Sequence, residues 1–90
     1  MSTHVHTITV QDPIGLHARP VGQIVTLVRE KGASVTLRSA AGGEALATSA
    51  LKMLALKVKT GETLEIVVDS AGSSDPETLS GDIEKLINQG

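Results

Sequence analysis

The hydrophobic period changes once within the stretch from His4 to Gly32, which reads HVHTITVQDPIGLHARPVGQIVTLVREKG. Its first part, residues 4–10, alternates and is rich in β-branched side chains, which predicts a strand. Residues 11–15 are a cluster of turn-forming residues and predict a loop. From Ala18 onward the apolar residues recur at helical spacing, and a glycine is typical of the position just past a helix end. The stretch therefore predicts a strand, a loop and an amphipathic helix in that order.

Three further segments alternate between apolar and polar residues and predict strands; they cover residues 33–38, 44–47 and 63–68. The turn Ala41-Gly42-Gly43 is expected to join the first two as a hairpin. A short helix is predicted over residues 50–56, between the second and third of these strands.

The start of the last helix has the clearest local signal. Ser74-Asp75-Pro76-Glu77 has the spacing of a capping box, with proline in the first turn. The resulting order is strand, helix, two strands, helix, strand, helix. It predicts the α+β class, as an open-faced β-sandwich whose four-stranded, mainly antiparallel sheet carries three helices on one face. At 90 residues the chain is expected to form one domain, 1–90.

The composition excludes several functions, because the chain has no Phe, Tyr or Trp and no Cys. Disulfides, thiolate zinc sites and cysteine nucleophiles are impossible without cysteine. The lack of Phe, Tyr and Trp and the net charge of -2 argue against a nucleic-acid partner. No signal-like or membrane-spanning apolar run is present, so a cytoplasmic protein without membrane insertion is expected.

His4 and His6 share one face of the first predicted strand. Two ligands without a third partner are a weak basis for a metal site. We therefore interpret them as solvated or half-buried strand residues and expect no metal site.

His17 stands directly before the first predicted helix, where no Ser, Thr, Asp or Asn is placed to cap it. The first N–H groups, around Ala18 and Arg19, are then open to water or to an anion. Pro20 presets the helical φ and removes one donor. Arg19 opposes the helix dipole, which costs about 0.3–1 kcal/mol at an exposed site but is understandable if a negative group arrives beside it.

Together these residues can hold a phosphoryl group on a histidine ring. Arginine presents a planar fork that fits phosphate oxygens, and a neutral imidazole has the lone pair that attack on phosphorus requires. The alternative from the residues alone is that the His17 ring caps the helix and that Arg19 is merely solvated.

The run Gly15-Leu16-His17-Ala18-Arg19-Pro20 resembles the active-site signature of HPr, the histidine-containing phosphocarrier family of the phosphoenolpyruvate-dependent sugar phosphotransferase system. The resemblance covers essentially the whole chain and implies one HPr-like phosphocarrier domain. It implies that His17 is phosphorylated on the ring nitrogen nearer the backbone and that Arg19 neutralises the phosphoryl oxygens. It also implies that Pro20 fixes the helix start and that Gly15 lets the loop turn tightly.

The resemblance implies a second, regulatory site, because the family's serine at the start of the second helix falls on Ser49. A serine kinase or phosphorylase is then a partner, although Ser49 also fits a simple N-cap. Ala50, Lys52 and Lys57 depart from the pattern of the kinase-regulated members.

The resemblance also implies a small apolar docking patch beside the histidine. The positions that match it are Val21, Gln23, Leu51, Lys52 and Leu54. Leu51 and Leu54 belong as well to a helical apolar stripe, so part of this set can instead be core.

The implied function is to accept a phosphoryl group from phosphorylated enzyme I on His17 and to pass it to an enzyme IIA domain during sugar uptake. The chain would be a monomeric covalent carrier without a cofactor, rather than a stand-alone enzyme. Two alternatives stay open. One is a carrier of a parallel branch, serving nitrogen control or a dihydroxyacetone kinase, and the other is a regulatory binding module of the same fold that transfers nothing.

Overall fold

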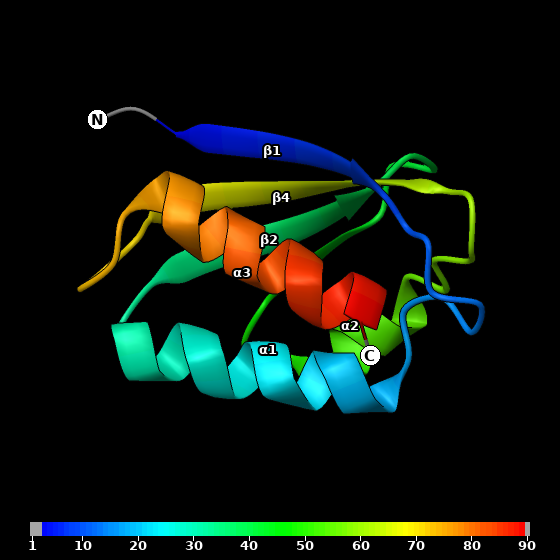
Figure 1. Cartoon of the computed structure of the whole chain (residues 1–90), viewed down its shortest axis with the longest axis horizontal. Coiled ribbons are helices and arrows are strands. Elements are labelled where there is room, and N and C mark those ends of the chain that lie inside the picture. The colour runs from blue at the N-terminus through cyan, green and yellow to red at the C-terminus, as the bar shows by residue number, and fades with distance from the viewer. Residues whose placement is uncertain (1–2, 90) are drawn as a thin grey trace.

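The computed structural model describes residues 3–89 and has the predicted order of elements (Figure 1). The strands are β1 (His4–Thr9), β2 (Ser34–Ser39), β3 (Glu44–Leu46) and β4 (Thr63–Ser70), and the helices are α1 (Ala18–Lys31), α2 (Ala50–Ala55) and α3 (Pro76–Gln89). Every predicted element is present, and the differences from the predicted ranges are confined to the ends of the elements.

The sheet has the strand order β1-β4-β2-β3, and each neighbouring pair is antiparallel. The helices cover one of its faces, which confirms the open-faced sandwich (Figure 1). Because β4 pairs with β1, the end of β1 lies beside the turn that precedes β4. The Val10 N–H donates to the Glu62 carbonyl at 2.9 Å, and the Gly61 N–H donates to the Val10 carbonyl at 2.8 Å. These bonds anchor the start of the loop that leads to α1.

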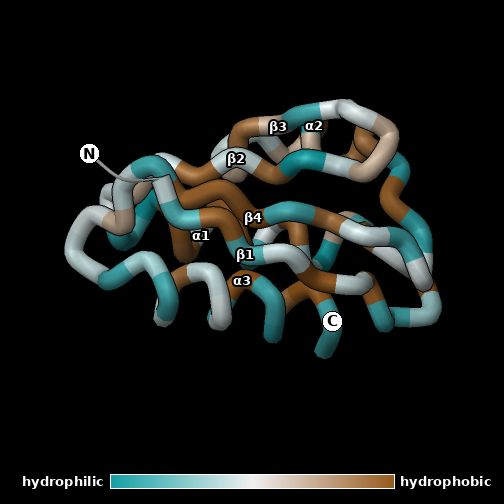
Figure 2. Tube along the Cα trace, turned by 90° about the horizontal axis from the view of Figure 1, so that it is seen from above, coloured by the Kyte–Doolittle hydropathy of each residue, from teal (hydrophilic) through white to brown (hydrophobic). Residues whose placement is uncertain are grey.

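The core lies between the sheet and the helices and is built from aliphatic side chains. Its largest fully buried members are Ile24, Leu37, Met53, Leu64, Ile66, Leu79, Ile83 and Ile87. Figure 2 shows the hydrophobic segments where strands and helices approach one another, while the outer turns of α3 are hydrophilic. Burial of each such side chain contributes about 1.5–3 kcal/mol to the stability of the fold. Because aliphatic and aromatic side chains contribute similar amounts, the core can be stable without an aromatic residue. Within residues 3–89, no helix has the length and apolar character to span a bilayer.

The uncovered face of the sheet carries a row of polar side chains across all four strands. Thr7 pairs with Glu65, Glu65 with Arg38, and Arg38 with Glu44. The Arg38 Nε lies 2.6 Å from the Glu65 Oε1, and this hydrogen bond raises the pKa of Arg38 above its ordinary value. A charged row of this kind keeps the open face of the sheet in water.

The cap of α3 is Asp75, so the predicted capping box from Ser74 to Glu77 is wrong by one residue. The Asp75 carboxylate accepts the Thr78 N–H at 3.0 Å and the Thr78 hydroxyl at 2.6 Å. The reason is Pro76, which begins the helix and therefore makes the residue before it the cap. The two bonds from Thr78 lower the pKa of Asp75 below its usual range.

Replacing Asp75 by alanine should lower the unfolding temperature by about 4–8 °C at neutral pH. Because the folded state lowers the pKa of Asp75, the ionised carboxylate is the stabilising form. The difference between wild type and variant should therefore shrink as the pH falls below about 4. Thermal unfolding followed by circular dichroism at both pH values measures this. Glu77→Gln serves as the control, because it removes a charge from the first turn of α3 but leaves the Asp75 cap in place. Equal unfolding temperatures for wild type and Asp75→Ala would contradict the assignment of Asp75 as the cap.

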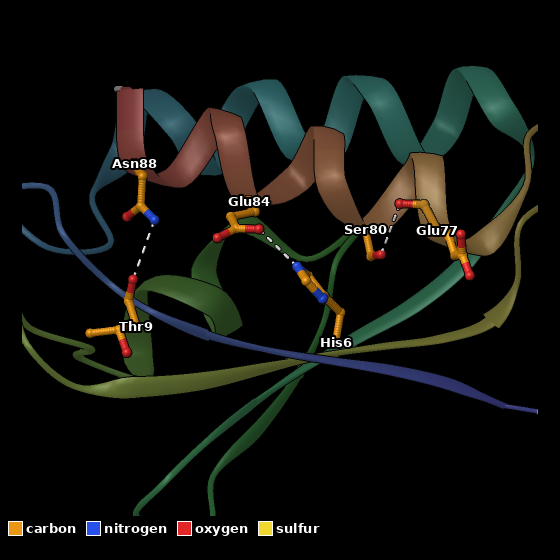
Figure 3. A network of polar contacts seen from close by, with 6 residues as sticks. All are labelled: His6, Thr9, Glu77, Ser80, Glu84 and Asn88. Carbon is orange, nitrogen blue, oxygen red and sulfur yellow. Dashed lines mark hydrogen bonds and ion pairs between the residues drawn. The ribbon is translucent and has the colours of Figure 1, made fainter.

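Polar contacts fasten α3 to β1 (Figure 3). The His6 Nε2 and the Glu84 Oε1 face each other at 2.8 Å. The Asn88 amide donates to the Thr9 carbonyl at 3.3 Å and accepts the Gln11 N–H at 2.7 Å. Asn88 thus holds both the last residue of β1 and the first stretch of the loop that leads to α1.

Candidate functional site

His17 is the residue immediately before α1, with an extended backbone at φ -126° and ψ 179°. Its carbonyl accepts the Val21 N–H at 3.2 Å, so the helical hydrogen bonding starts at this residue. Its ring makes no capping hydrogen bond, which rules out the alternative in which the ring caps the helix. The side chain is 22% exposed, so part of the ring can be reached from solvent.

The first turn of α1 offers unoccupied positive groups. The amides of Ala18 and Arg19 have no hydrogen-bond acceptor among residues 3–89, and no acidic residue lies in this turn. Pro20 is buried and has no N–H to offer. The Arg19 side chain is exposed and takes part in no ion pair within the described part of the chain. An anion arriving here would meet two free N–H groups, a guanidinium and the positive end of the helix dipole.

Gly15 turns the loop toward α1 at φ +83°, a conformation that favours glycine. A Cβ at this position would lie 2.6 Å from the Val58 carbonyl oxygen, closer than atoms can pack. The same carbonyl accepts the Leu16 N–H at 3.0 Å. The residue before His17 is therefore tied to the segment that follows α2, and the absence of a side chain at Gly15 permits that approach. This geometry fits the turning role expected of Gly15.

Asp12 lies beside the His17 ring, a neighbour that the sequence reasoning missed. The Asp12 Oδ1 is 3.8 Å from the His17 Nε2, and both atoms are shielded from solvent: the Asp12 side chain is 8% exposed and Nε2 is fully buried. Nε2 has no hydrogen-bond partner among residues 3–89. In the sequence, Asp12 stands before proline in the cluster of turn-forming residues 11–15, where aspartate is common. Only its burial in the folded protein marks it as a candidate site residue.

The residues of the predicted docking patch differ in their exposure to solvent. Val21 lies on the buried face of α1 and is 1% exposed, so it offers almost no surface to a partner. Gln23 is exposed and lines a hollow between α1 and α3 that Arg19 also borders. On α2, Leu51 is 82% exposed and Lys52 is exposed, whereas Leu54 is half-buried and packs against the core. The side chains that a partner can meet on α2 are therefore Leu51 and Lys52.

Ser49 occupies the residue before α2, as predicted, but its hydroxyl makes no capping hydrogen bond. Its side chain is half-buried, and its carbonyl accepts the Met53 N–H at 3.0 Å. The regulatory role of Ser49 stays a prediction.

His4 and His6 are half-buried strand residues, in keeping with the interpretation from the sequence. Within residues 3–89, no three side chains of His, Asp or Glu gather as a metal site would require.

The fold and this helix start define a class of protein: a small open-faced sandwich that presents a histidine at an uncapped helix N-terminus. The chain belongs to the HPr family, since the family model described as "PTS HPr component phosphorylation site" matches residues 5–89. HPr-family proteins are phosphocarriers rather than stand-alone catalysts.

Relatives support this assignment. The chain is 33% identical over 84 residues to the phosphocarrier protein NPr of Escherichia coli strain K12, covering 93% of this chain and 90% of that protein. It is 31% identical over 77 residues to NPr of Proteus mirabilis, covering 86% and 83%. The crystal structure of the phosphocarrier protein HPr from Bacillus anthracis superposes with a TM-score of 0.81 at 21% identity, over 97% of this chain and 99% of that one. This last match shows the shared fold.

Proposed function

We propose that His17 accepts a phosphoryl group from a phosphohistidine of an enzyme I-type donor and passes it to a histidine of an enzyme IIA-type domain. The observation that carries the proposal is the placement of His17 before an uncapped helix, with Nε2 as the buried, unpartnered nitrogen of its ring. Nδ1, the nitrogen nearer the backbone, is then the nucleophile.

Each neighbour has a role in this transfer. A phosphoryl group on Nδ1 would be held by the free amides of Ala18 and Arg19 and by the Arg19 guanidinium. Pro20 and Gly15 fix the helix start and the turn, so the ring is held in place before the donor arrives. The binding must be modest, because a phosphoryl group that is bound tightly in the carrier would not be passed on.

The proposal is tested by incubating the protein with phosphoenolpyruvate and enzyme I and then following transfer to an added enzyme IIA domain. We expect phosphate on the protein that is labile in acid and stable in base, followed by its appearance on the IIA domain. Failure of the wild-type protein to take up phosphate from either a sugar-type or a nitrogen-type enzyme I would contradict the carrier function.

The substitution Arg19→Glu should change stability and transfer in opposite directions. It replaces an unfavourable cation in the first turn of α1 by a favourable anion, and each change contributes about 0.3–1 kcal/mol, so the protein should become more stable by about 0.6–2 kcal/mol. Transfer should slow by about tenfold or more, because a charge-assisted contact to the phosphoryl oxygens is lost and a repulsive charge replaces it. Urea unfolding and quenched-flow transfer assays measure the two effects. Arg29→Glu, at the far end of the same helix, is the control; an unchanged transfer rate in Arg19→Glu would remove Arg19 from the site.

The names of the relatives favour the parallel branch over sugar uptake. The curated relatives at 31–33% identity are called NPr, whereas the solved HPr structures share 21%. We therefore propose that the chain serves an NPr-like, nitrogen-type branch instead of the sugar-uptake role that the signature alone suggests. Phosphorylated protein should transfer faster to a nitrogen-type IIA domain than to a sugar-type one at equal concentration. The reverse preference would assign the chain to sugar uptake.

A further inference from the structure

We propose that Asp12 is a positioning residue for phosphoryl transfer: it keeps the Nε2 proton on His17 and compensates the positive charge that the ring gains when Nδ1 is phosphorylated. This inference rests on the proposed function of His17. It assigns to Asp12 a task that neither the signature run nor the first turn of α1 performs.

The observation is a buried carboxylate next to a buried ring nitrogen. The Asp12 Oδ1 and the His17 Nε2 are 3.8 Å apart, and Nε2 has no hydrogen-bond partner within residues 3–89. A buried polar atom without a partner is costly, so Nε2 is expected to be oriented toward the group that can satisfy it. The distance exceeds that of a hydrogen bond, and we expect it to shorten during transfer, because catalytic hydrogen bonds are often long in the free protein and tighten in the reacting complex.

Asp12 is itself held in place, so it can act as a fixed charge. Its Oδ1 accepts the Ile14 N–H at 2.8 Å. Its carbonyl accepts the Gly15 N–H at 2.9 Å and the hydroxyl of Thr60. The carboxylate thus belongs to the turn that directly precedes His17 and the start of α1.

The chemistry needs a negative group at this place. In the neutral ring with a proton on Nε2, the Nδ1 lone pair forms the new N–P bond while the N–P bond to the donor histidine breaks and its electron pair stays on the donor nitrogen. The Nε2 proton remains, so the phosphorylated ring carries a positive charge. Arg19 and the helix end face the phosphoryl group but oppose this ring charge, whereas Asp12 favours it. When the phosphoryl group leaves, the N–P electron pair returns to Nδ1 and the neutral ring is restored.

The test uses Asp12→Asn, which removes the charge but retains a carbonyl oxygen for the Ile14 N–H. The matched control is Glu62→Gln, since Glu62 also accepts a backbone N–H through its side chain, from Lys59 at 2.6 Å, in the neighbouring turn. Asp12→Ser, whose hydroxyl can accept the same Ile14 N–H, is the second variant should asparagine disturb the fold. Thermal unfolding of all variants establishes that they are folded.

The first readout is the His17 tautomer, measured by ¹⁵N NMR in the unphosphorylated protein at a pH where the imidazole is neutral. We expect the Nε2–H form to dominate in wild type and in Glu62→Gln. The ratio of Nε2–H to Nδ1–H should fall about tenfold in Asp12→Asn, since an opposite charge at this distance has about that effect.

The second readout is the rate of phosphoryl uptake from phosphorylated enzyme I, which should fall about tenfold in Asp12→Asn and not in Glu62→Gln. An unchanged tautomer ratio in a folded Asp12 variant would overturn the inference, and so would a changed ratio with an unchanged rate. If wild type takes up no phosphate, the proposed function fails, while the tautomer ratio still decides whether Asp12 orients the ring.

Discussion

Replacing His17 by alanine should abolish phosphoryl uptake from enzyme I, with at least a thousandfold loss, because the nucleophile itself is removed. The fold should survive, since the His17 ring makes no capping hydrogen bond to α1. Its neighbour Leu16 remains tied to the Val58 carbonyl in the variant.

The other two histidines of the chain provide the matched controls. His4→Ala and His6→Ala should leave phosphoryl uptake unchanged, because both residues lie on β1 and His6 faces Glu84 on α3. The measurement is the stoichiometry of acid-labile phosphate on each variant. Uptake by His17→Ala, or its loss in His6→Ala with the fold intact, would place the acceptor elsewhere.

Replacing Gly72 by alanine should produce the largest loss of stability of any single substitution considered for this protein. Gly72 has φ +60°, and a Cβ there would lie 1.8 Å from the Lys31 carbonyl oxygen. That oxygen accepts the Ser73 N–H at 2.8 Å, so the segment before α3 is pressed against the end of α1. To make room for a methyl group, either the hydrogen bond from Ser73 to Lys31 must break or the last turn of α1 must move.

Gly32 provides a control with nearly the same backbone conformation. Its φ is +62°, but a Cβ there would meet no atom within 4 Å. Gly32→Ala should therefore lower the free energy of unfolding only by the strain of a left-handed alanine, about 1–2 kcal/mol. Gly72→Ala should lower it by the same strain and by about 1–3 kcal/mol more, because the added methyl group clashes. Urea unfolding measures the difference. Equal losses in both variants would show that conformation alone, and not close packing between α1 and the α3 loop, requires glycine at position 72.

Local signals account for what the sequence predicted correctly. The α1 helix begins at Ala18 and ends before Gly32 because apolar periodicity and a left-handed glycine act within a few residues. The four strands follow from alternation in the same way, and a core made only of aliphatic side chains follows from the composition.

Contacts that no local sequence pattern encodes account for what it missed. The ring of His17 meets Asp12 only because the turn folds back on itself, and Gly15 is constrained by Val58, which lies far along the chain. Val21 was assigned to a partner surface from a family position, although its helical spacing with Ile24 already indicated burial. The position of the α3 cap at Asp75 could have been predicted from the sequence, because proline at the first helical position makes the preceding residue the cap.

The central claim is that His17 carries the phosphoryl group on Nδ1, and NMR of the phosphorylated, ¹⁵N-labelled protein tests it most directly. The phosphorus resonance should show one-bond coupling to the ring nitrogen nearer the backbone of His17, with the proton still on Nε2. Coupling to Nε2, or a phosphorus signal attached to any other residue, would contradict the account.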